Sequence, residues 1–227
     1  MKDEFNEMRE PQAQYSVARK KIEGYEPEPP KKRVSLEDYL EMIADGTRRL
    51  EYHDGEVVDI QSATEIHGKI CTNLTRLIGN CIYEKDCDVY AGDREVWVAP
   101  CNKMFYPDVI VVCGEHDMKK MSKNVHATVN PSLVIEVLSE STEGYDLTTK
   151  MRCYKKMKGL KQIIFVAQIE KYVRVLTHSE EENAVFWKDA EYFEDEEKIQ
   201  IGDCTVLLQD IYRRVTLDSQ GERATEA

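Results

Sequence analysis

The sequence predicts a mixed α/β fold built around a central β-sheet. Residues 106–112 and 132–138 are short runs rich in Val and Ile, which is typical of buried strands. Between residues 64 and 84 the apolar side chains recur at helical spacing, which predicts one long helix. Because strands both precede and follow the helical segments, the order favours a mixed sheet.

The first half of the chain carries clear start and stop signals. Ser35 is expected to cap a helix that ends near Gly46. Asp54-Gly55 separates two alternating segments, which is a strong signal for a β-hairpin. Short strands are expected at 88–90 and 95–98, after the long helix.

The second half continues the alternation. A polar loop is expected at 114–130, between the two Val- and Ile-rich strands. A helix should run from about Tyr145 to Met157 and end at Gly159. The remaining expected elements are paired strands at 163–167 and 172–176, edge strands at 184–187 and 206–208, and a terminal turn near Ile211.

The chain length of 227 residues suits one domain with an extra arm. Residues 1–33 are polar and end in a proline-rich, charged linker, so they are expected to form a mobile arm. The domain should cover residues 34–217, and residues 218–227 are expected to be a disordered tail.

Charge and cysteine usage narrow the function classes. A net charge of −12 argues against a protein that coats nucleic acid, but it leaves room for an enzyme with a local basic groove. No segment resembles a membrane helix or a signal peptide, so a cytoplasmic protein that does not bind membranes is expected. The seven cysteines form no metal-binding pairs in sequence and are expected to be reduced, space-filling thiols.

Each of the two strong strands carries one acid, Asp108 in the first and Glu136 in the second. An ionised acid on a buried strand is costly unless its charge is compensated. A divalent cation shared by both acids would supply that compensation. Lys150 follows in the next helical segment, and two acids with a lysine are the minimal set for metal-dependent phosphodiester hydrolysis.

A longer pattern contains these residues and resembles the Uma2 family (DUF820) of restriction-endonuclease-like proteins, from about Ser35 to Val215. The pattern consists of residues 50–58, His67 at the start of the long helix, Tyr106-Pro107-Asp108-Val109, Ile135-Glu136-Val137-Leu138-Ser139, Thr142, Asp146, Lys150 and Tyr154. The resemblance implies the PD-(D/E)XK nuclease fold, a restriction-endonuclease-like mixed central β-sheet flanked by helices, with Mg²⁺ or Mn²⁺ at the active site.

One departure from the wider superfamily concerns the lysine. In the general superfamily pattern the lysine lies two residues after the second acid, where this chain has Leu138, whereas the resemblance to Uma2 implies Lys150 instead. An apolar side chain cannot stabilise a reacting phosphate. Lys150 from the following helix is expected to take its place, because its long stem can bring the ammonium to the strand.

Within this scheme Asp108 and Glu136 bind the metal, and the carbonyl of Val137 is a third ligand. Lys150 lies beside the attacking water or the scissile phosphate. Glu51 is a further acid that acts directly or through a water, and His67 lies at the edge of the site.

Simpler roles remain open for several of these residues. Lys150 could be an exposed helix lysine, Glu51 could pair with Arg48 or Arg49, and His67 could bond a backbone group. Asp146 could cap its helix or orient Lys150. Tyr154 is expected to pack in the core. The loop lysines Lys119, Lys120 and Lys123 are either solvated or close to a bound phosphate.

The expected function is metal-dependent endonuclease activity on nucleic acid, with DNA favoured over RNA. A binding or regulatory module that keeps the nuclease fold without catalysis is the alternative, and a hydrolase of other phosphoesters is a third possibility. A homodimer is compatible with cutting two strands, by analogy with enzymes of that type.

Overall fold

The computed structural model describes residues 33–60, 62–181 and 184–217. The expected tail at 218–227 lies outside the described residues, as does the expected arm apart from Arg33. None of the helices in these ranges is long and apolar enough to cross a membrane.

The described residues form fourteen strands and seven helical segments. The helical segments are α1 (Leu36–Met42), α2 (Glu65–Ile82), the 3₁₀ turn η1 (Ala99–Cys101), α3 (Glu143–Tyr145), the π-helix η2 (Asp146–Lys150), α4 (Met151–Tyr154) and α5 (Leu208–Ile211). The strands are β1 (Leu50–His53), β2 (Glu56–Asp59), β3 (Cys87–Ala91), β4 (Val96–Val98), β5 (Lys103–Phe105), β6 (Val109–Cys113), β7 (Met118–Lys120), β8 (His126–Thr128), β9 (Leu133–Leu138), β10 (Gln162–Ala167), β11 (Val173–Glu181), β12 (Ala184–Tyr192), β13 (Lys198–Ile201) and β14 (Cys204–Leu207).

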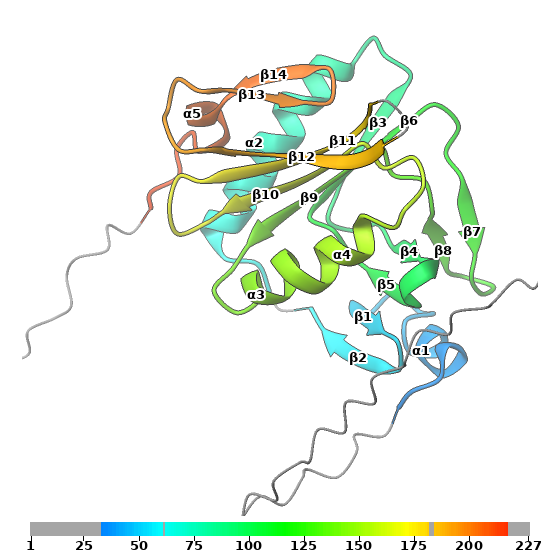
Figure 1. Ribbon diagram of the computed structural model, residues 1–227. Helices are drawn as coiled ribbons and strands as arrows, with labels where there is room; N and C mark the ends of the chain where they lie inside the picture. The colour runs from blue at the N-terminus through cyan, green and yellow to red at the C-terminus, as the bar shows by residue number, and fades with distance from the viewer. Residues whose placement is uncertain (1–32, 61, 182–183, 218–227) are drawn as a thin grey trace, which may run out of the picture. The chain divides into compact units, whose positions relative to one another are not determined.

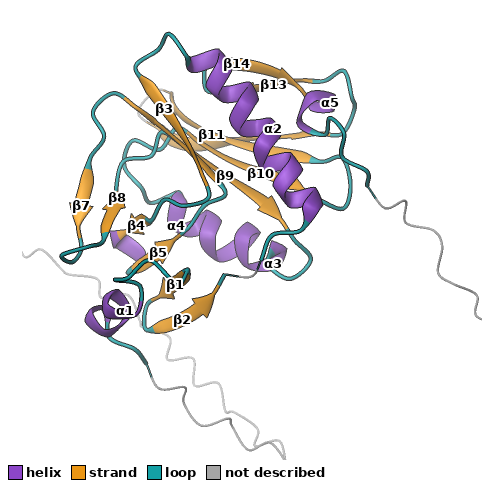
Figure 2. Cartoon of the chain, turned by 180° about the vertical axis from the view of Figure 1, so that it is seen from behind, coloured by secondary structure: helices purple, strands orange, loops and turns teal. Residues whose placement is uncertain are grey.

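The central sheet has the strand order β12-β11-β10-β9-β6-β3. Strands β9 and β10 are parallel, and the other neighbours in this sheet are antiparallel. Figures 1 and 2 show α2 on one face of the sheet and α4 on the other. The predicted mixed α/β fold is therefore confirmed.

Alternation along β6 and β9 sends successive side chains to the two faces. Val109, Val111 and Ile135 pack in the core that α2 covers. Ile110 and Val134 pack in the core on the side of α4. Each face thus has its own apolar cluster, and even-numbered positions of both strands point toward α4.

A second sheet has the order β2-β1-β5-β4-β8-β7. The predicted hairpin at Asp54-Gly55 joins β1 to β2, with positive φ angles of 53° and 99° at its two turn residues. Helix α1 begins where expected, since the Ser35 hydroxyl accepts a hydrogen bond from the Asp38 amide at 3.0 Å. The hydroxyl of Tyr39 donates to the Leu50 carbonyl at 2.7 Å and ties α1 to β1.

Two predictions of local structure were wrong. The segment 114–130 was expected to be a loop, but it contains β7 and β8, which pair with each other. These three-residue strands are too short for a periodic pattern, and β7 has the polar sequence Met-Lys-Lys. The helix expected at 145–157 is instead interrupted by a π-helical turn at Asp146–Lys150. Contacts with the rest of the fold, which the local sequence does not show, decide whether such a turn forms. π-Helical turns are frequent at functional sites.

The expectation of reduced thiols was also wrong, because six of the seven cysteines form disulfides. The pairs are Cys81–Cys204, Cys87–Cys113 and Cys101–Cys153. Cys71 is free. Partners that lie 26 to 123 residues apart in sequence leave no local spacing signal, so the fold has to be known before they can be paired.

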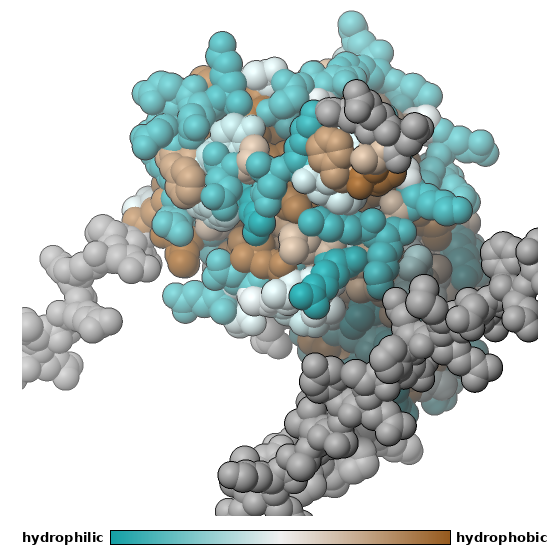
Figure 3. All heavy atoms as spheres, viewed as in Figure 1, coloured by the Kyte–Doolittle hydropathy of each residue, from teal (hydrophilic) through white to brown (hydrophobic). Residues whose placement is uncertain are grey.

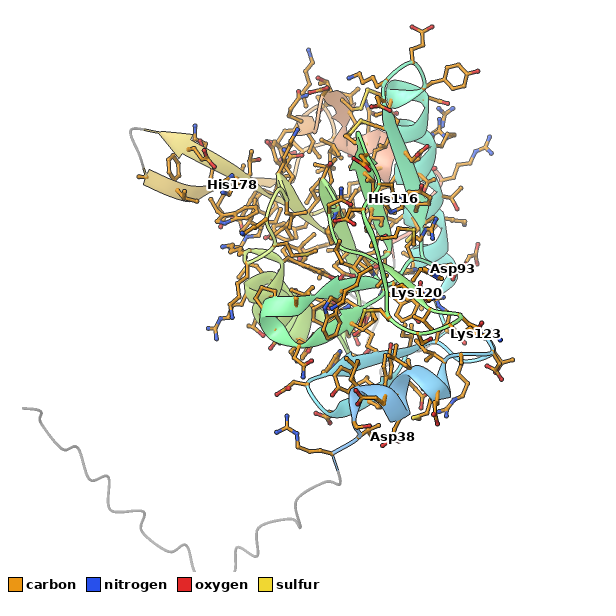
Figure 4. The ribbon with its side chains drawn as sticks, turned by 90° about the vertical axis from the view of Figure 1, so that its right-hand side faces the viewer. Asp38, Asp93, His116, Lys120, Lys123 and His178 are labelled. Atoms are coloured by element: carbon orange, nitrogen blue, oxygen red, sulfur yellow. A yellow bond between two sulfur atoms is a disulfide. The ribbon has the colours of Figure 1, made fainter. Side chains whose placement is uncertain are left out.

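The surface of the face drawn in Figure 3 is largely hydrophilic, with apolar residues in separate patches. Strands β11 and β12 extend beyond the rest of the central sheet as a hairpin that carries His178 (Figure 4).

Candidate active site

The ammonium of Lys150 is the centre of a buried charged cluster. Its Nζ atom lies 3.1 Å from Glu51 Oε1, 3.3 Å from Glu136 Oε1 and 3.3 Å from Asp146 Oδ1. The side chain of Lys150 is only 10% exposed. The alternative of an exposed helix lysine is therefore wrong.

Three separate elements supply the acids around this lysine. Glu51 comes from β1, Glu136 from β9, and Asp146 from the same π-helical turn as Lys150. Within that turn the two residues are four positions apart and both are buried. Asp146 therefore orients the lysine, which was one of its two expected roles.

Tyr154 adds a hydrogen bond to this cluster. Its hydroxyl donates to Glu136 Oε1 at 2.6 Å. The ring packs in the core against Phe105, with centroids 5.4 Å apart. The expected packing role is confirmed, but the contact with an acid was not predicted.

Asp108 lies immediately before β6, at the same end of the β6–β9 strand pair as Glu136. Since Val109 is opposite Ile135 in the register, Asp108 falls beside Glu136 at the end of the strand pair. Oδ2 of Asp108 accepts a hydrogen bond from the Val137 amide at 2.7 Å. The two acids that the sequence singled out are thus neighbours.

The other oxygen of Asp108 faces α2. Oδ1 lies 3.1 Å from Nε2 of His67, in the first turn of that helix. The Thr64 hydroxyl accepts a hydrogen bond from the His67 amide at 3.1 Å and caps the helix. The ring of His67 is therefore aimed at an acid of the cluster rather than at a backbone group.

Glu51 is held from both sides. Its Oε1 accepts a hydrogen bond from the Tyr106 amide at 3.2 Å, and its Oε2 lies 2.9 Å from His53 Nε2. The His53 ring stacks on Tyr145 with centroids 4.8 Å apart.

The two arginines considered as surface partners of Glu51 bind other acids. Arg48 pairs with Asp59 and Arg49 pairs with Asp93. The surface pairing proposed for Glu51 is wrong.

Burial and the charges of neighbouring groups both shift the pKa values in this cluster, and for each group the attraction between opposite charges acts against the effect of burial. Burial raises the pKa of Glu136 well above its ordinary value, and Lys150 offsets this only in part. Burial alone would lower the pKa of Lys150, but the attraction of Glu136, Glu51 and Asp146 outweighs it and holds that pKa well above the usual range. Burial would also raise the pKa of Glu51, yet Lys150 and His53 lower it overall.

These shifts restrict what each group can do. Lys150 remains an ammonium at any working pH, so it can stabilise negative charge but cannot act as a base. Burial disfavours the ionised form of Glu136, and added positive charge would favour that form. A divalent cation beside Glu136 and Asp108 would provide that charge.

The donor set fits a hard cation. Carboxylate oxygens dominate it, and a strand residue directs its N–H and C=O to the same edge, so the Val137 carbonyl faces Asp108 as its amide does. Three carboxylates, those of Glu51, Glu136 and Asp146, surround one lysine ammonium, and Asp108 adds a further negative charge near Glu136. The cluster therefore has an excess of negative charge.

The structure brings together every residue expected at the site, namely Glu51, His67, Asp108, Glu136, Val137 and Lys150. Sequence reasoning did not predict that His53, Tyr145 and Cys71 lie beside these residues. His53 could have been found, because residues two apart on a strand share a face and Glu51 was already a candidate.

The three loop lysines lie on or near β7. The ammonium of Lys119 lies over the Trp97 ring, 5.4 Å from its centroid. Lys120 and Lys123 are exposed along this segment (Figure 4). A contact with phosphate remains a prediction for these residues.

Comparison with known proteins gives concordant matches. The family model Uma2, described as "Putative restriction endonuclease", matches residues 36–211. The uncharacterised protein sll1609 of Synechocystis sp. is 31% identical over 148 residues, covering 63% of this chain and 82% of that protein. The uncharacterised protein slr1290 of the same organism is 29% identical over 144 residues, covering 63% and 74%.

The fold also matches a solved structure. The crystal structure of a "putative nuclease belonging to DUF820" from Anabaena variabilis superposes with a TM-score of 0.62 at 14% sequence identity. The match covers 79% of this chain and 97% of that one. With the family model spanning most of the described domain, the chain belongs to the Uma2 family of restriction-endonuclease-like proteins.

Proposed function

We propose that this protein is a metal-dependent endonuclease of the PD-(D/E)XK type that hydrolyses phosphodiester bonds in DNA. The single observation that carries the proposal is the position of Lys150. Its ammonium reaches Glu136 from a following helix and so replaces the lysine that Leu138 cannot provide. Lysine, paired acids and a strand carbonyl are then available at one end of β6 and β9.

Asp108, Glu136 and the Val137 carbonyl would hold Mg²⁺ or Mn²⁺. The cation would lower the pKa of a bound water and neutralise charge on the phosphate. The ammonium of Lys150 would stabilise the charge that develops during attack. Glu51 and Asp146 keep this ammonium in place, and His53 in turn holds Glu51.

The net charge of −12 means that the chain has little general attraction for a polyanion. Divalent cations would therefore serve both in binding and in hydrolysis. The described residues of one chain contain one such cluster, so cutting both strands of a duplex with it requires two chains or two encounters.

The test is cleavage of supercoiled plasmid DNA by the full chain in Mg²⁺ or Mn²⁺. Glu136→Gln and Asp108→Asn should each reduce the rate at least about 100-fold, because each removes a charged metal ligand. Asp93→Asn is the matched control, since Asp93 is exposed and pairs only with Arg49 among the contacts described. Wild-type and Glu136→Gln proteins that cut DNA equally well would contradict the proposal.

A binding or regulatory module without catalysis is the second candidate, and the acidic net charge favours it. It predicts no cleavage of single- or double-stranded DNA or of RNA with either cation. A small phosphodiester that is hydrolysed without competition from duplex DNA would instead indicate a hydrolase of other phosphoesters.

A further inference from the structure

On the side of α2, Asp108 meets two further potential metal ligands, His67 and Cys71, which the proposed hydrolysis does not need. His67 and Cys71 are four residues apart on α2 and therefore share one helix face. A ligand atom from each, together with a carboxylate oxygen of Asp108, lies within 4.8 Å of the other two. All three residues are half-buried.

The spacing is close to that of a tetrahedral metal site. His67 Nε2 lies 3.1 Å from Asp108 Oδ1, and Cys71 Sγ lies 4.0 Å from the same nitrogen. With metal–ligand distances of about 2.0 to 2.3 Å, ligand atoms in a tetrahedral zinc site are about 3.3 to 3.7 Å apart. The third separation, between Cys71 Sγ and a carboxylate oxygen of Asp108, is within 4.8 Å, so side-chain movement of up to about an ångström would bring all three atoms to these distances.

The donor types indicate which cation fits. Mg²⁺ prefers oxygen, whereas a thiolate and an imidazole select a softer ion such as Zn²⁺ or Co²⁺. Cys71 is available for this role, because the other six cysteines are paired in disulfides. Three protein ligands would leave one position open for water.

We propose that His67, Cys71 and Asp108 form a second metal site, specific for thiophilic divalent cations of the Zn²⁺ class. The site is defined by its own ligands and does not depend on nuclease activity. One consequence does rest on the proposed function: both sites use Asp108, so bound Zn²⁺ would compete with Mg²⁺ for this carboxylate and slow hydrolysis.

Cobalt gives a readout that requires no enzymatic activity. Co²⁺ is titrated into the full chain without Mg²⁺ and without reductant, so that the disulfides remain intact. We expect one equivalent to produce a thiolate-to-cobalt charge-transfer band in the near ultraviolet, and Zn²⁺ to remove that band. Cys71→Ser should abolish the band, and His67→Gln should weaken cobalt affinity about tenfold or more.

Glu136→Gln is the control, since Glu136 is not a ligand of this site and its variant should keep the band. A wild-type protein without the band, a band that persists in Cys71→Ser, or an unchanged affinity in His67→Gln would each overturn the proposal.

A further measurement uses the wild-type protein alone and so does not depend on any variant folding. Zn²⁺ should slow the alkylation of Cys71 by iodoacetamide, because a coordinated thiolate is protected. An alkylation rate that is the same with and without Zn²⁺ would also overturn the proposal.

Discussion

The two faces of the central sheet both carry an apolar cluster, but the α4 side also holds the buried charged cluster around Lys150. On the side of α2, residues such as Ile70, Leu74 and Ile135 form a continuous apolar core. On the side of α4, β9 instead presents Glu136 to Lys150 and Tyr154. The first face stabilises the fold by removing apolar surface from water, at about 25 cal/mol per Å².

The α4 side also buries charged groups, and buried charges stabilise a protein only when each one is compensated. Here the carboxylates outnumber the ammonium, and burial, with a smaller contribution from the neighbouring acids, raises the pKa of Glu136. The charged cluster around Lys150 is therefore unfavourable for folding by itself, and the cation proposed above would offset its excess negative charge.

The largest expected effect comes from removing the only lysine of the cluster. Lys150→Met should lower the free energy of unfolding by about 3–5 kcal/mol at neutral pH, because it leaves buried acids uncompensated. The folded-state pKa of Lys150 is raised, so its contribution is complete below its unfolded pKa and is lost only as pH rises through the folded value. Chemical denaturation measures the change.

Lys158→Met is the matched control for this variant, since Lys158 is exposed in the same region and its loss should change stability by about 0.5 kcal/mol or less. The loss in Lys150→Met should also shrink as the acids protonate at lower pH. If Lys150→Met and Lys158→Met had the same free energy of unfolding, the buried acids would not depend on Lys150 for charge compensation.

An intermediate effect of the opposite sign is expected for Glu136→Gln. Because the folded-state pKa of Glu136 is raised, the wild type loses stability as pH increases from the unfolded pKa through the folded one. Glutamine does not titrate and keeps an acceptor for Tyr154. Without metal the variant should be more stable by about 1 kcal/mol at neutral pH, and the gap should widen with pH.

Thermal unfolding at several pH values, in the presence of a chelator, measures this difference. A Glu136→Gln protein that is less stable than the wild type at every pH would break the contrast between the two faces.

The smallest effect should come from an ion pair outside both cores. Lys171 Nζ lies 2.6 Å from Asp195, closer than any partner of Lys150, but both side chains are about 40% exposed. Lys171→Met should change the free energy of unfolding by about 1 kcal/mol or less, and salt should reduce the effect further. A loss as large as that of Lys150→Met would show that distance rather than burial decides the energetics.

Sequence reasoning predicted the parts of the molecule that depend on local patterns. The hairpin at Asp54-Gly55, the long helix and the two strands that carry Asp108 and Glu136 follow from turn chemistry and periodicity. The pairing of the two acids followed from the cost of burying them singly.

What was missed depends on tertiary contacts. The π-turn at Asp146–Lys150, the short strands β7 and β8, and the disulfides all require partners that are distant in sequence. The contacts of Glu51 with Lys150 and His53 belong to the same class, because β1 lies in a different sheet from β9.

The central claim, that Asp108 and Glu136 hold a divalent cation, is tested most directly by Mn²⁺ binding. Electron paramagnetic resonance of free Mn²⁺ in a titration of wild type and Glu136→Gln gives the bound fraction without any substrate. We predict saturable uptake by the wild type and at least about tenfold weaker binding by Glu136→Gln. No uptake by the wild type, or equal uptake by both proteins, would contradict the account.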